Sequence, residues 1–90
     1  MTLAERFGVN LRRVRRRAGI SQSELALMTE MHRTGIWMLE SGKRAPRLDT
    51  LVKLVSALQC PADELVEGMR WKPDFKTYGE WEVTDPGARL

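Results

Sequence analysis

The chain has 90 residues, of which 42% are hydrophobic and 30% are charged. This length and composition are typical of one ordered globular domain with a short appendage, and they exclude a disordered chain. No apolar stretch approaches the roughly 18 residues of a membrane span, and residues 1–10 lack the apolar core of a signal peptide. With one cysteine, Cys60, no internal disulfide can form. We therefore expect a cytoplasmic protein in which Cys60 is a small buried apolar residue.

The charge is divided unevenly along the chain. The net charge is +3, but residues 1–58 hold eleven Lys/Arg and five Asp/Glu, whereas residues 59–90 hold four and seven. The first part is thus +6 and the second −3. A basic first part suits a polyanion such as DNA, although a solvated basic surface has the same composition.

A first helix is expected from Thr2, as its N-cap, to about Ala18. Thr2 and Glu5 have the spacing of a capping box, and Gly19 is placed to end the helix. Gly8 should weaken its middle. The apolar residues follow helical spacing: Leu3, Phe7, Leu11, Val14 and Ala18.

Five arginines crowd the end of this helix: Arg12, Arg13, Arg15, Arg16 and Arg17. Because neighbouring like charges repel, helix stability does not explain the cluster. It suits either contact with phosphates or a solvated basic face.

Residues 21–42 predict two short helices joined by a tight turn. Ser21 and Glu24 form a second capping box. The apolar residues of the two helices are Leu25, Ala26 and Met28, then Met31, Ile36 and Leu39. Gly42 stands where a glycine would end the second helix. Neither helix is long enough to be stable alone, so both must pack against flanking segments.

Two further helices should complete the core. Residues 48–58 carry apolar residues around most of a helix, so we expect most of this helix to be buried. Pro61 can begin a short helix over about residues 62–66, and Leu65 and Val66 are expected to close the bundle.

The last part, residues 67–90, holds four of the six aromatic residues: Trp71, Phe75, Tyr78 and Trp81. Residues 80–83 alternate polar and apolar side chains as a short strand does. Turn signals at residues 73–74 and 78–79 favour an extended or β-hairpin-like tail. We expect its aromatics to dock, either on a second subunit or back on the helices, and residues 84–90 to fray. We therefore expect the chain to consist of a helical domain, residues 1–67, and an appendage for docking or dimerisation, residues 68–90.

One motif identifies a family. The residues Ser21-Gln22-x-x-Leu25-Ala26, followed by Ile36-x-x-Leu39-Glu40-x-Gly42-Lys43-x-x-Pro46, resemble the Cro/C1-type (XRE-family) helix-turn-helix of phage repressors and bacterial regulators. The resemblance runs from about residue 11 to 65. It implies an all-α fold, a five-helix lambda-repressor-like bundle, here followed by the short tail.

Two residues of the turn depart from the family pattern. Glu30 stands where the family usually has a glycine with positive φ, so we expect either strain or a differently built turn. His32 stands where Ser or Thr usually caps the recognition helix, so we expect a weaker cap.

The resemblance also implies the functional residues. Base edges in the major groove would be contacted by Arg33, Thr34, Gly35 and Met38. The DNA backbone would be contacted by Ser21, Gln22, Trp37, Lys43, Arg44 and Arg47. Arg15 and Glu40 would form a structural pair, which leaves Arg12, Arg13, Arg16 and Arg17 to face solvent or phosphate.

The expected function is a sequence-specific transcriptional regulator. We expect a repressor that binds double-stranded DNA as a homodimer on a palindromic operator. The alternative is a protein-interaction module, or the antitoxin of a toxin–antitoxin pair, because Gly35, Trp37 and Met38 make the reading face less polar than usual. No residue pattern indicates an enzyme, a metal or a cofactor, and we expect no membrane partner.

Overall fold

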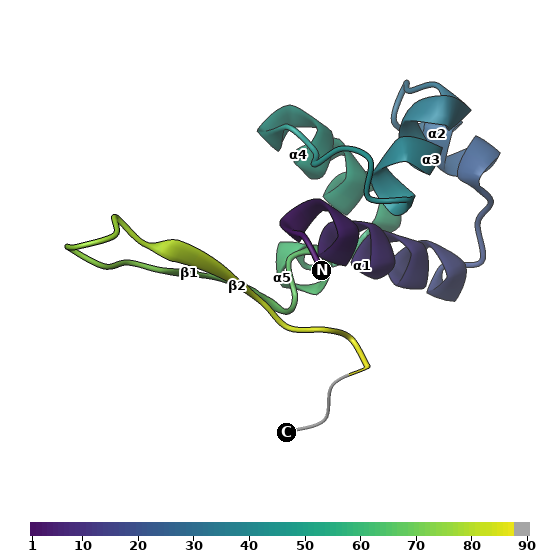
Figure 1. Ribbon diagram of the computed structural model, residues 1–90. Helices are drawn as coiled ribbons and strands as arrows, with labels where there is room; N and C mark the ends of the chain where they lie inside the picture. The colour runs from purple at the N-terminus through teal and green to yellow at the C-terminus, as the bar shows by residue number, and fades with distance from the viewer. Residues whose placement is uncertain (88–90) are drawn as a thin grey trace.

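Five helices form a bundle, and a two-stranded hairpin extends from it (Figure 1). The computed structural model describes residues 1–87. The elements are α1 (Leu3–Arg17), α2 (Gln22–Met28), α3 (Arg33–Glu40), α4 (Leu48–Leu58), α5 (Ala62–Leu65), β1 (Met69–Lys72) and β2 (Glu80–Val83). This architecture confirms the predicted lambda-repressor-like bundle with a hairpin-like tail. The fraying expected for residues 84–90 includes residues 88–90, which lie outside the described residues. Within residues 1–87, no helix is long and apolar enough to cross a membrane.

The first two helices begin at the predicted capping boxes. The Thr2 hydroxyl oxygen accepts the Glu5 N–H at 3.1 Å, and the Glu5 carboxylate accepts the Thr2 N–H at 2.9 Å. The same exchange joins Ser21 and Glu24 at 3.0 and 3.1 Å. The hydrogen bond from the Thr2 backbone also lowers the pKa of Glu5. Local sequence thus fixes where α1 and α2 begin.

Gly42 ends α3, as predicted. Its φ is +74°, and the Lys43 N–H donates to the Met38 carbonyl at 2.9 Å, as in a Schellman motif. A Cβ on Gly42 would lie only 2.7 Å from Cγ of Glu5. Gly42 therefore both reverses the chain and brings the end of α3 against the start of α1.

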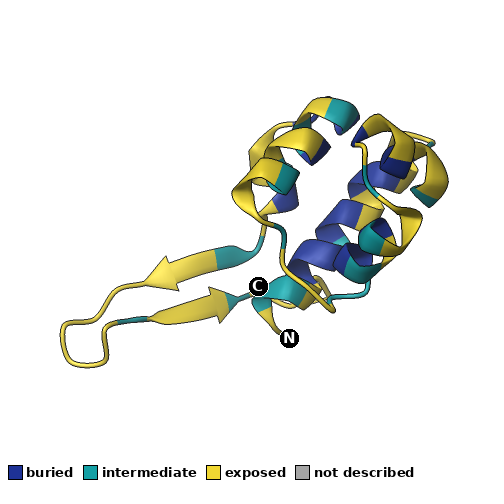
Figure 2. Cartoon of the chain, turned by 90° about the horizontal axis from the view of Figure 1, so that it is seen from above, coloured by how far each residue is buried: buried dark blue, intermediate teal, exposed yellow. Residues whose placement is uncertain are grey.

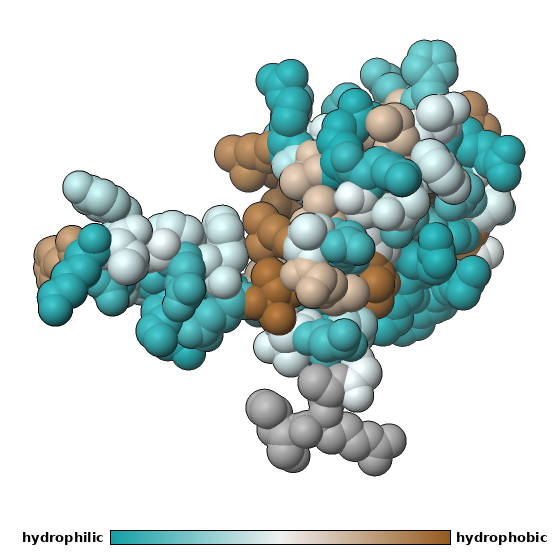
Figure 3. Space-filling model, viewed as in Figure 1, coloured by the Kyte–Doolittle hydropathy of each residue, from teal (hydrophilic) through white to brown (hydrophobic). Residues whose placement is uncertain are grey.

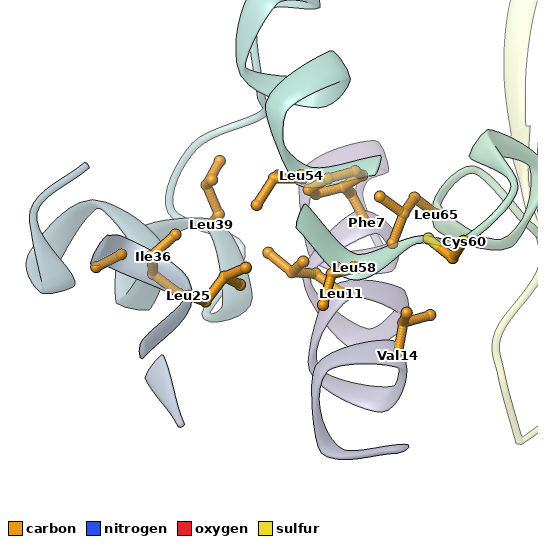
Figure 4. Packing of buried hydrophobic residues seen from close by; sticks show 11 residues of the cluster. Phe7, Leu11, Val14, Leu25, Ile36, Leu39, Leu54, Leu58, Cys60 and Leu65 are labelled. Atoms are coloured by element: carbon orange, nitrogen blue, oxygen red, sulfur yellow. The ribbon is translucent and has the colours of Figure 1, made fainter. Parts of the chain in front are cut away.

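The core lies between the five helices, each of which contributes buried residues to it (Figures 2 and 4). Its buried apolar residues are Phe7, Leu11, Val14, Leu25, Ala26, Ile36, Leu39, Leu54, Leu58, Cys60 and Leu65. Cys60 is buried as expected, and desolvation by burial raises the pKa of its thiol. Leu25, Ile36 and Leu39 are fully or almost fully buried, so the two short helices are stabilised by this core.

The expectation that most of α4 is buried is wrong. Only Leu54 and Leu58 are buried, whereas Leu48 is 77% exposed and Val52 is 56% exposed. The apolar residues wrap around α4, but the bundle covers one side of it. At the end of α5, Val66 is likewise exposed rather than sealing the bundle.

The hairpin leaves the bundle after α5 and is almost entirely exposed (Figure 2). Its antiparallel register pairs Met69 with Val83, Arg70 with Glu82, Trp71 with Trp81, and Lys72 with Glu80. The rings of Trp71 and Trp81 meet edge to face with centroids 5.2 Å apart. Phe75 and Tyr78, near the far end, are 106% and 88% exposed. These two aromatics are therefore not folded back into the core.

Arg6 and Asn10 of α1 hold the base of the hairpin. The Arg6 guanidinium donates to the carbonyls of Glu67 at 2.9 Å and Thr84 at 2.7 Å. The buried Asn10 amide donates to the carbonyls of Leu65 and Glu67 at 3.0 and 2.8 Å. Sequence reasoning missed both residues, because an arginine and an asparagine on a helix give no sign of carbonyls that lie 55 to 78 residues away in the chain.

Candidate nucleic-acid interface

The turn between α2 and α3 keeps the family geometry with an unusual residue. Glu30 has a φ of +54°, in the left-handed region that glycine adopts readily. The Thr29 hydroxyl donates to the Leu25 carbonyl at 2.7 Å, and the Met31 N–H donates to the Ala26 carbonyl at 2.9 Å. Of the two alternatives for this turn, the structure therefore has the glycine-like conformation, which is strained for a glutamate.

His32 does not cap α3 through its side chain. It is the N-cap residue by backbone conformation, but its imidazole makes no capping hydrogen bond. Its carbonyl accepts the N–H groups of Gly35 and Ile36 at 2.9 and 3.2 Å. The expectation of a weak side-chain cap is wrong, and no side chain covers the start of α3 as Ser21 covers the start of α2.

A buried ion pair fixes the end of α3 against α1. Arg15 donates to Glu40 through Nε–Oε2 at 2.5 Å and through Nη2–Oε1 at 3.0 Å, in a bidentate arrangement. Arg15 also donates to the Ile20 carbonyl at 2.9 Å. Burial by itself would raise the pKa of Glu40, but hydrogen bonds from Arg15, Gln22 and Arg12 lower it. The pairing in turn raises the pKa of Arg15.

Glu40 also binds two residues that were expected to be free for DNA or solvent. Gln22 Nε2 donates to Glu40 Oε1 at 3.2 Å, and Arg12 Nε lies 3.4 Å from the same oxygen. Gln22 therefore has a structural contact whatever else it touches. Glu40 joins α1, α2 and α3 at one point.

The four arginines of α1 that were expected to face solvent or phosphate are all exposed, but three of them also form ion pairs. Besides Arg12, Arg13 pairs with Glu67 at 2.7 Å, and Arg17 pairs with Glu64. The acidic segment around α5 returns alongside α1 and neutralises part of the cluster. Among the described residues, only Arg16 of these four has no ion pair. The pairs of Arg13 and Arg17 are weak surface contacts because both partners are at least partly exposed, whereas Arg12 pairs with a buried carboxylate.

The outer face of α3 is open. Arg33 and Thr34 are exposed and Gly35 and Met38 are partly exposed, whereas Ile36 and Leu39 point into the core. Trp37 is 48% exposed. A shallow hollow of about 200 Å³ is lined by Gln22, Arg33, Thr34 and Trp37. The fold thus brings the start of α2 beside the outer face of α3.

Cations flank this face. Lys43 and Arg44 follow α3 and are exposed, and a second hollow of about 220 Å³ is lined by Arg44 and Arg47, among others. Arg47 also lies 3.7 Å from Asp49, with both side chains exposed. Within residues 1–87, Arg33, Lys43 and Arg44 have no ion-pair partner. Their charge is available to an anion.

The described residues contain no cluster of His, Cys, Asp or Glu that would hold a metal ion. The side chains of this surface are hydrogen-bond donors and cations around an exposed helix. Such a surface can neutralise phosphates and present donors to base edges.

A short helix, a tight turn and a second helix with an open basic face define a helix-turn-helix DNA-binding domain. A sequence model of the helix-turn-helix family matches residues 11–65. The chain belongs to this family, in its Cro/C1-type (XRE) branch, and is a DNA-binding transcription regulator of a generally non-enzymatic kind. No curated protein matches the chain.

Solved structures of the same fold are regulators. The restriction-modification controller protein C.AhdI from Aeromonas hydrophila is 34% identical with a TM-score of 0.66, over 69% of this chain and 94% of that one. The P22 c2 repressor, solved with a synthetic operator, is 31% identical with a TM-score of 0.64, over 69% and 94%. The clp gene regulator ClgR from Corynebacterium glutamicum, at 24% identity and a TM-score of 0.70 over 73% and 86%, shares the fold.

Proposed function

We propose that the protein is a transcriptional repressor that binds a palindromic operator as a dimer, with α3 of each copy in the major groove. The observation that carries the proposal is the open face of α3. Arg33 and Thr34 are exposed there beside Gln22, with unpaired Lys43 and Arg44 next to them. A recognition helix presents its N-terminal residues to base edges while cations around it bind phosphates.

Each residue at the start of α3 suits a particular contact. Arg33 can donate two hydrogen bonds to O6 and N7 of a guanine, and Thr34 and Met38 can contact a thymine methyl group. The space around Gly35 gives a further reason to place this part of α3 against DNA. A Cβ there would meet nothing closer than Cε of Met31 at 3.4 Å, so packing within the chain does not require glycine. A bare backbone at this point instead allows α3 to approach DNA closely.

The residues around α3 suit the DNA backbone. Lys43, Arg44 and Arg47 would bind phosphates, and Trp37 would pack along the sugar-phosphate chain beside Gln22 and Ser21. The Ser21 hydroxyl oxygen already accepts the Glu24 N–H, but its proton remains available to a phosphate. Occupying an operator by such a dimer would block polymerase sterically. Two relatives above 30% identity, a controller and a repressor, support a regulator of this kind.

Selection of bound sites from random duplexes tests the proposal. We expect an inverted repeat with half-sites about 10 base pairs apart, centre to centre. Binding of the selected site should weaken steeply with salt, and Lys43→Gln should lower the slope of log K against log [salt] by about 0.9 without changing base preference. Enrichment of no sequence, or binding that salt does not weaken, would refute the proposal.

A further inference from the structure

The hairpin of residues 69–83, which we call the arm, has one apolar face and one charged face. Because side chains alternate along a strand, the pairs Met69–Val83 and Trp71–Trp81 lie on one face. The pairs Arg70–Glu82 and Lys72–Glu80 lie on the other and join opposite charges across the strands. The arm is therefore amphipathic, although it projects away from the bundle (Figure 1).

The apolar face of the arm continues into a groove on the bundle. The groove has a volume of about 300 Å³, and the residues that line it include Leu3, Phe7, Pro46, Leu51, Trp71 and Trp81. The two tryptophans are 46% and 54% exposed. Figure 3 shows hydrophobic side chains gathered where the arm leaves the bundle, and again at the far end of the arm. One apolar surface thus runs from the bundle onto the arm.

A single copy of the chain leaves the aromatic residues of this surface exposed. A two-stranded hairpin without a packing partner is marginally stable in water. Phe75 and Tyr78, at the tip, are fully or almost fully exposed. Aromatic side chains bury about 150–250 Å² each when covered. Four aromatics and the groove supply a large share of the roughly 800 Å² per partner in a standard interface.

We propose that the arm and the groove form a two-fold interface with a second copy of this chain. In it the two arms lie antiparallel with their apolar faces together, and the tip of each arm covers the groove of the other copy. The proposal rests on the proposed function, in which two copies bind one operator. A two-fold interface must be self-complementary, and a surface with a groove at one end and exposed aromatics at the other satisfies this condition.

Charge favours a second copy as the occupant. Residues 69–83 carry three Lys/Arg and three Asp/Glu, so the arm is neutral, whereas the bundle, residues 1–68, carries eleven Lys/Arg and eight Asp/Glu and is thus +3. Two bundles repel each other, but two arms do not. The arm also has little attraction for DNA, because it is neutral and each basic residue of β1 is paired with an acidic residue of β2. The charged face, where Lys72 lies 3.8 Å from Glu82, can stay in solvent when the apolar faces meet.

Charge also opposes pairing of the arms edge to edge. Antiparallel pairing of two β2 strands about Trp81 would set Glu80 of one copy opposite Glu82 of the second copy. Pairing of two β1 strands about Trp71 would set Arg70 opposite Lys72 in the same way. Like charges directly opposite destabilise a sheet. Packing of the apolar faces avoids both arrangements.

The dimer dissociation constant of the full chain, measured by sedimentation equilibrium, tests the interface. We expect the wild type to dimerise at micromolar concentration and Trp81→Ser to weaken the dimer at least 50-fold. Glu80→Ser introduces the same residue one position away on the charged face and should change the constant less than 3-fold. A wild type that is monomeric at 100 µM, or equal constants for the two variants, would overturn the proposal and leave the arm to another protein.

A disulfide trap tests the arrangement itself. One mixture combines Phe75→Cys, at the tip of the arm, with Ala45→Cys, at the rim of the groove. The control mixture combines Phe75→Cys with Gln59→Cys, at the end of α4. The mixed disulfide should form at least 10-fold faster in the first mixture than in the control. Equal rates would contradict coverage of the groove by the tip.

Binding of a duplex with one half-site separates the two proposals. The dissociation constant of Trp81→Ser for this duplex should lie within 2-fold of the wild-type value, because α3 is not altered. A dimer that forms but binds no DNA would refute the proposed function and support the interface.

Discussion

Glu40 of α3 is a buried carboxylate that is hydrogen-bonded by residues of two other helices. It accepts hydrogen bonds from Arg15 and Arg12 of α1 and from Gln22 of α2. Removing one partner of a buried ion pair leaves the other charge buried and unpaired, which costs about 3–5 kcal/mol. Glu40 is therefore important for the placement of α3 although it is itself buried.

The lowered pKa of Glu40 makes its contribution depend on pH. A carboxyl whose pKa is lower in the folded state stabilises the fold fully above its unfolded pKa of 4.5 and loses that contribution as pH falls toward the folded value. Glu40→Gln should lower the free energy of unfolding by about 3 kcal/mol at pH 7, and this gap should shrink below pH 4.5. Urea unfolding of both proteins at pH 7, 4.5 and 3 measures it. A gap that stays constant with pH would contradict the role of the charged pair.

Glu30 is strained, because its backbone has a conformation that suits glycine. Its φ of +54° costs a residue with a Cβ about 1–2 kcal/mol. We predict that Glu30→Gly raises the free energy of unfolding by about 0.5–1 kcal/mol, less than the full strain because glycine also gains freedom in the unfolded state. Glu30→Ala is the matched control, since it removes the charge but keeps the Cβ, and it should give no gain. Equal gains in thermal or urea unfolding would assign the effect to charge instead.

At the scale of elements, the crossing of α1 and α3 depends on Gly8. A Cβ on Gly8 would lie 2.5 Å from the Glu40 carbonyl oxygen and 2.6 Å from that of Leu39. Both contacts are with backbone, which cannot move aside as a flexible side chain can. The sequence pattern indicated only a glycine that weakens a helix, because the close approach of two backbones belongs to the packed structure.

Gly8→Ala should therefore destabilise the protein although alanine is the better helix former. The helical preference favours alanine by about 1 kcal/mol, but overpacking at the crossing should outweigh it and give a net loss of about 1–3 kcal/mol. Chemical unfolding measures the difference. A net gain near 1 kcal/mol, as at an open helix position, would mean that α1 and α3 are not in this close contact.

The elements that sequence alone could predict are those whose signals are local. Capping boxes at Thr2 and Ser21 and the glycine at Gly42 set helix ends, and the alternation in residues 80–83 indicated a strand. Long-range features were missed or misjudged. The burial of α4 depends on which side meets the bundle, and the pairing of Arg13 and Arg17 depends on where α5 returns. The Arg15–Glu40 pair was anticipated because the family resemblance supplied it.

At the scale of the whole molecule, charge and apolar surface are separated. Three basic residues without an ion pair in residues 1–87, Arg33, Lys43 and Arg44, lie on α3 or directly after it, and the acidic residues near α5 pair with α1 on another part of the bundle. The apolar surface lies at the junction of bundle and arm (Figure 3). In the two proposals, the basic surface binds a polyanion and the separate apolar surface binds a second copy, as a dimeric DNA-binding protein requires.

The most direct measurement is the base preference of Arg33→Ala beside that of the wild type, on the selected operator and its single base-pair variants at one salt concentration. The wild type should discriminate one guanine in each half-site by about 1–3 kcal/mol, and Arg33→Ala should lose that discrimination while keeping the others. If Arg33→Ala kept the full preference at every position, α3 would not be reading the groove through Arg33, and the placement of the recognition helix would be wrong.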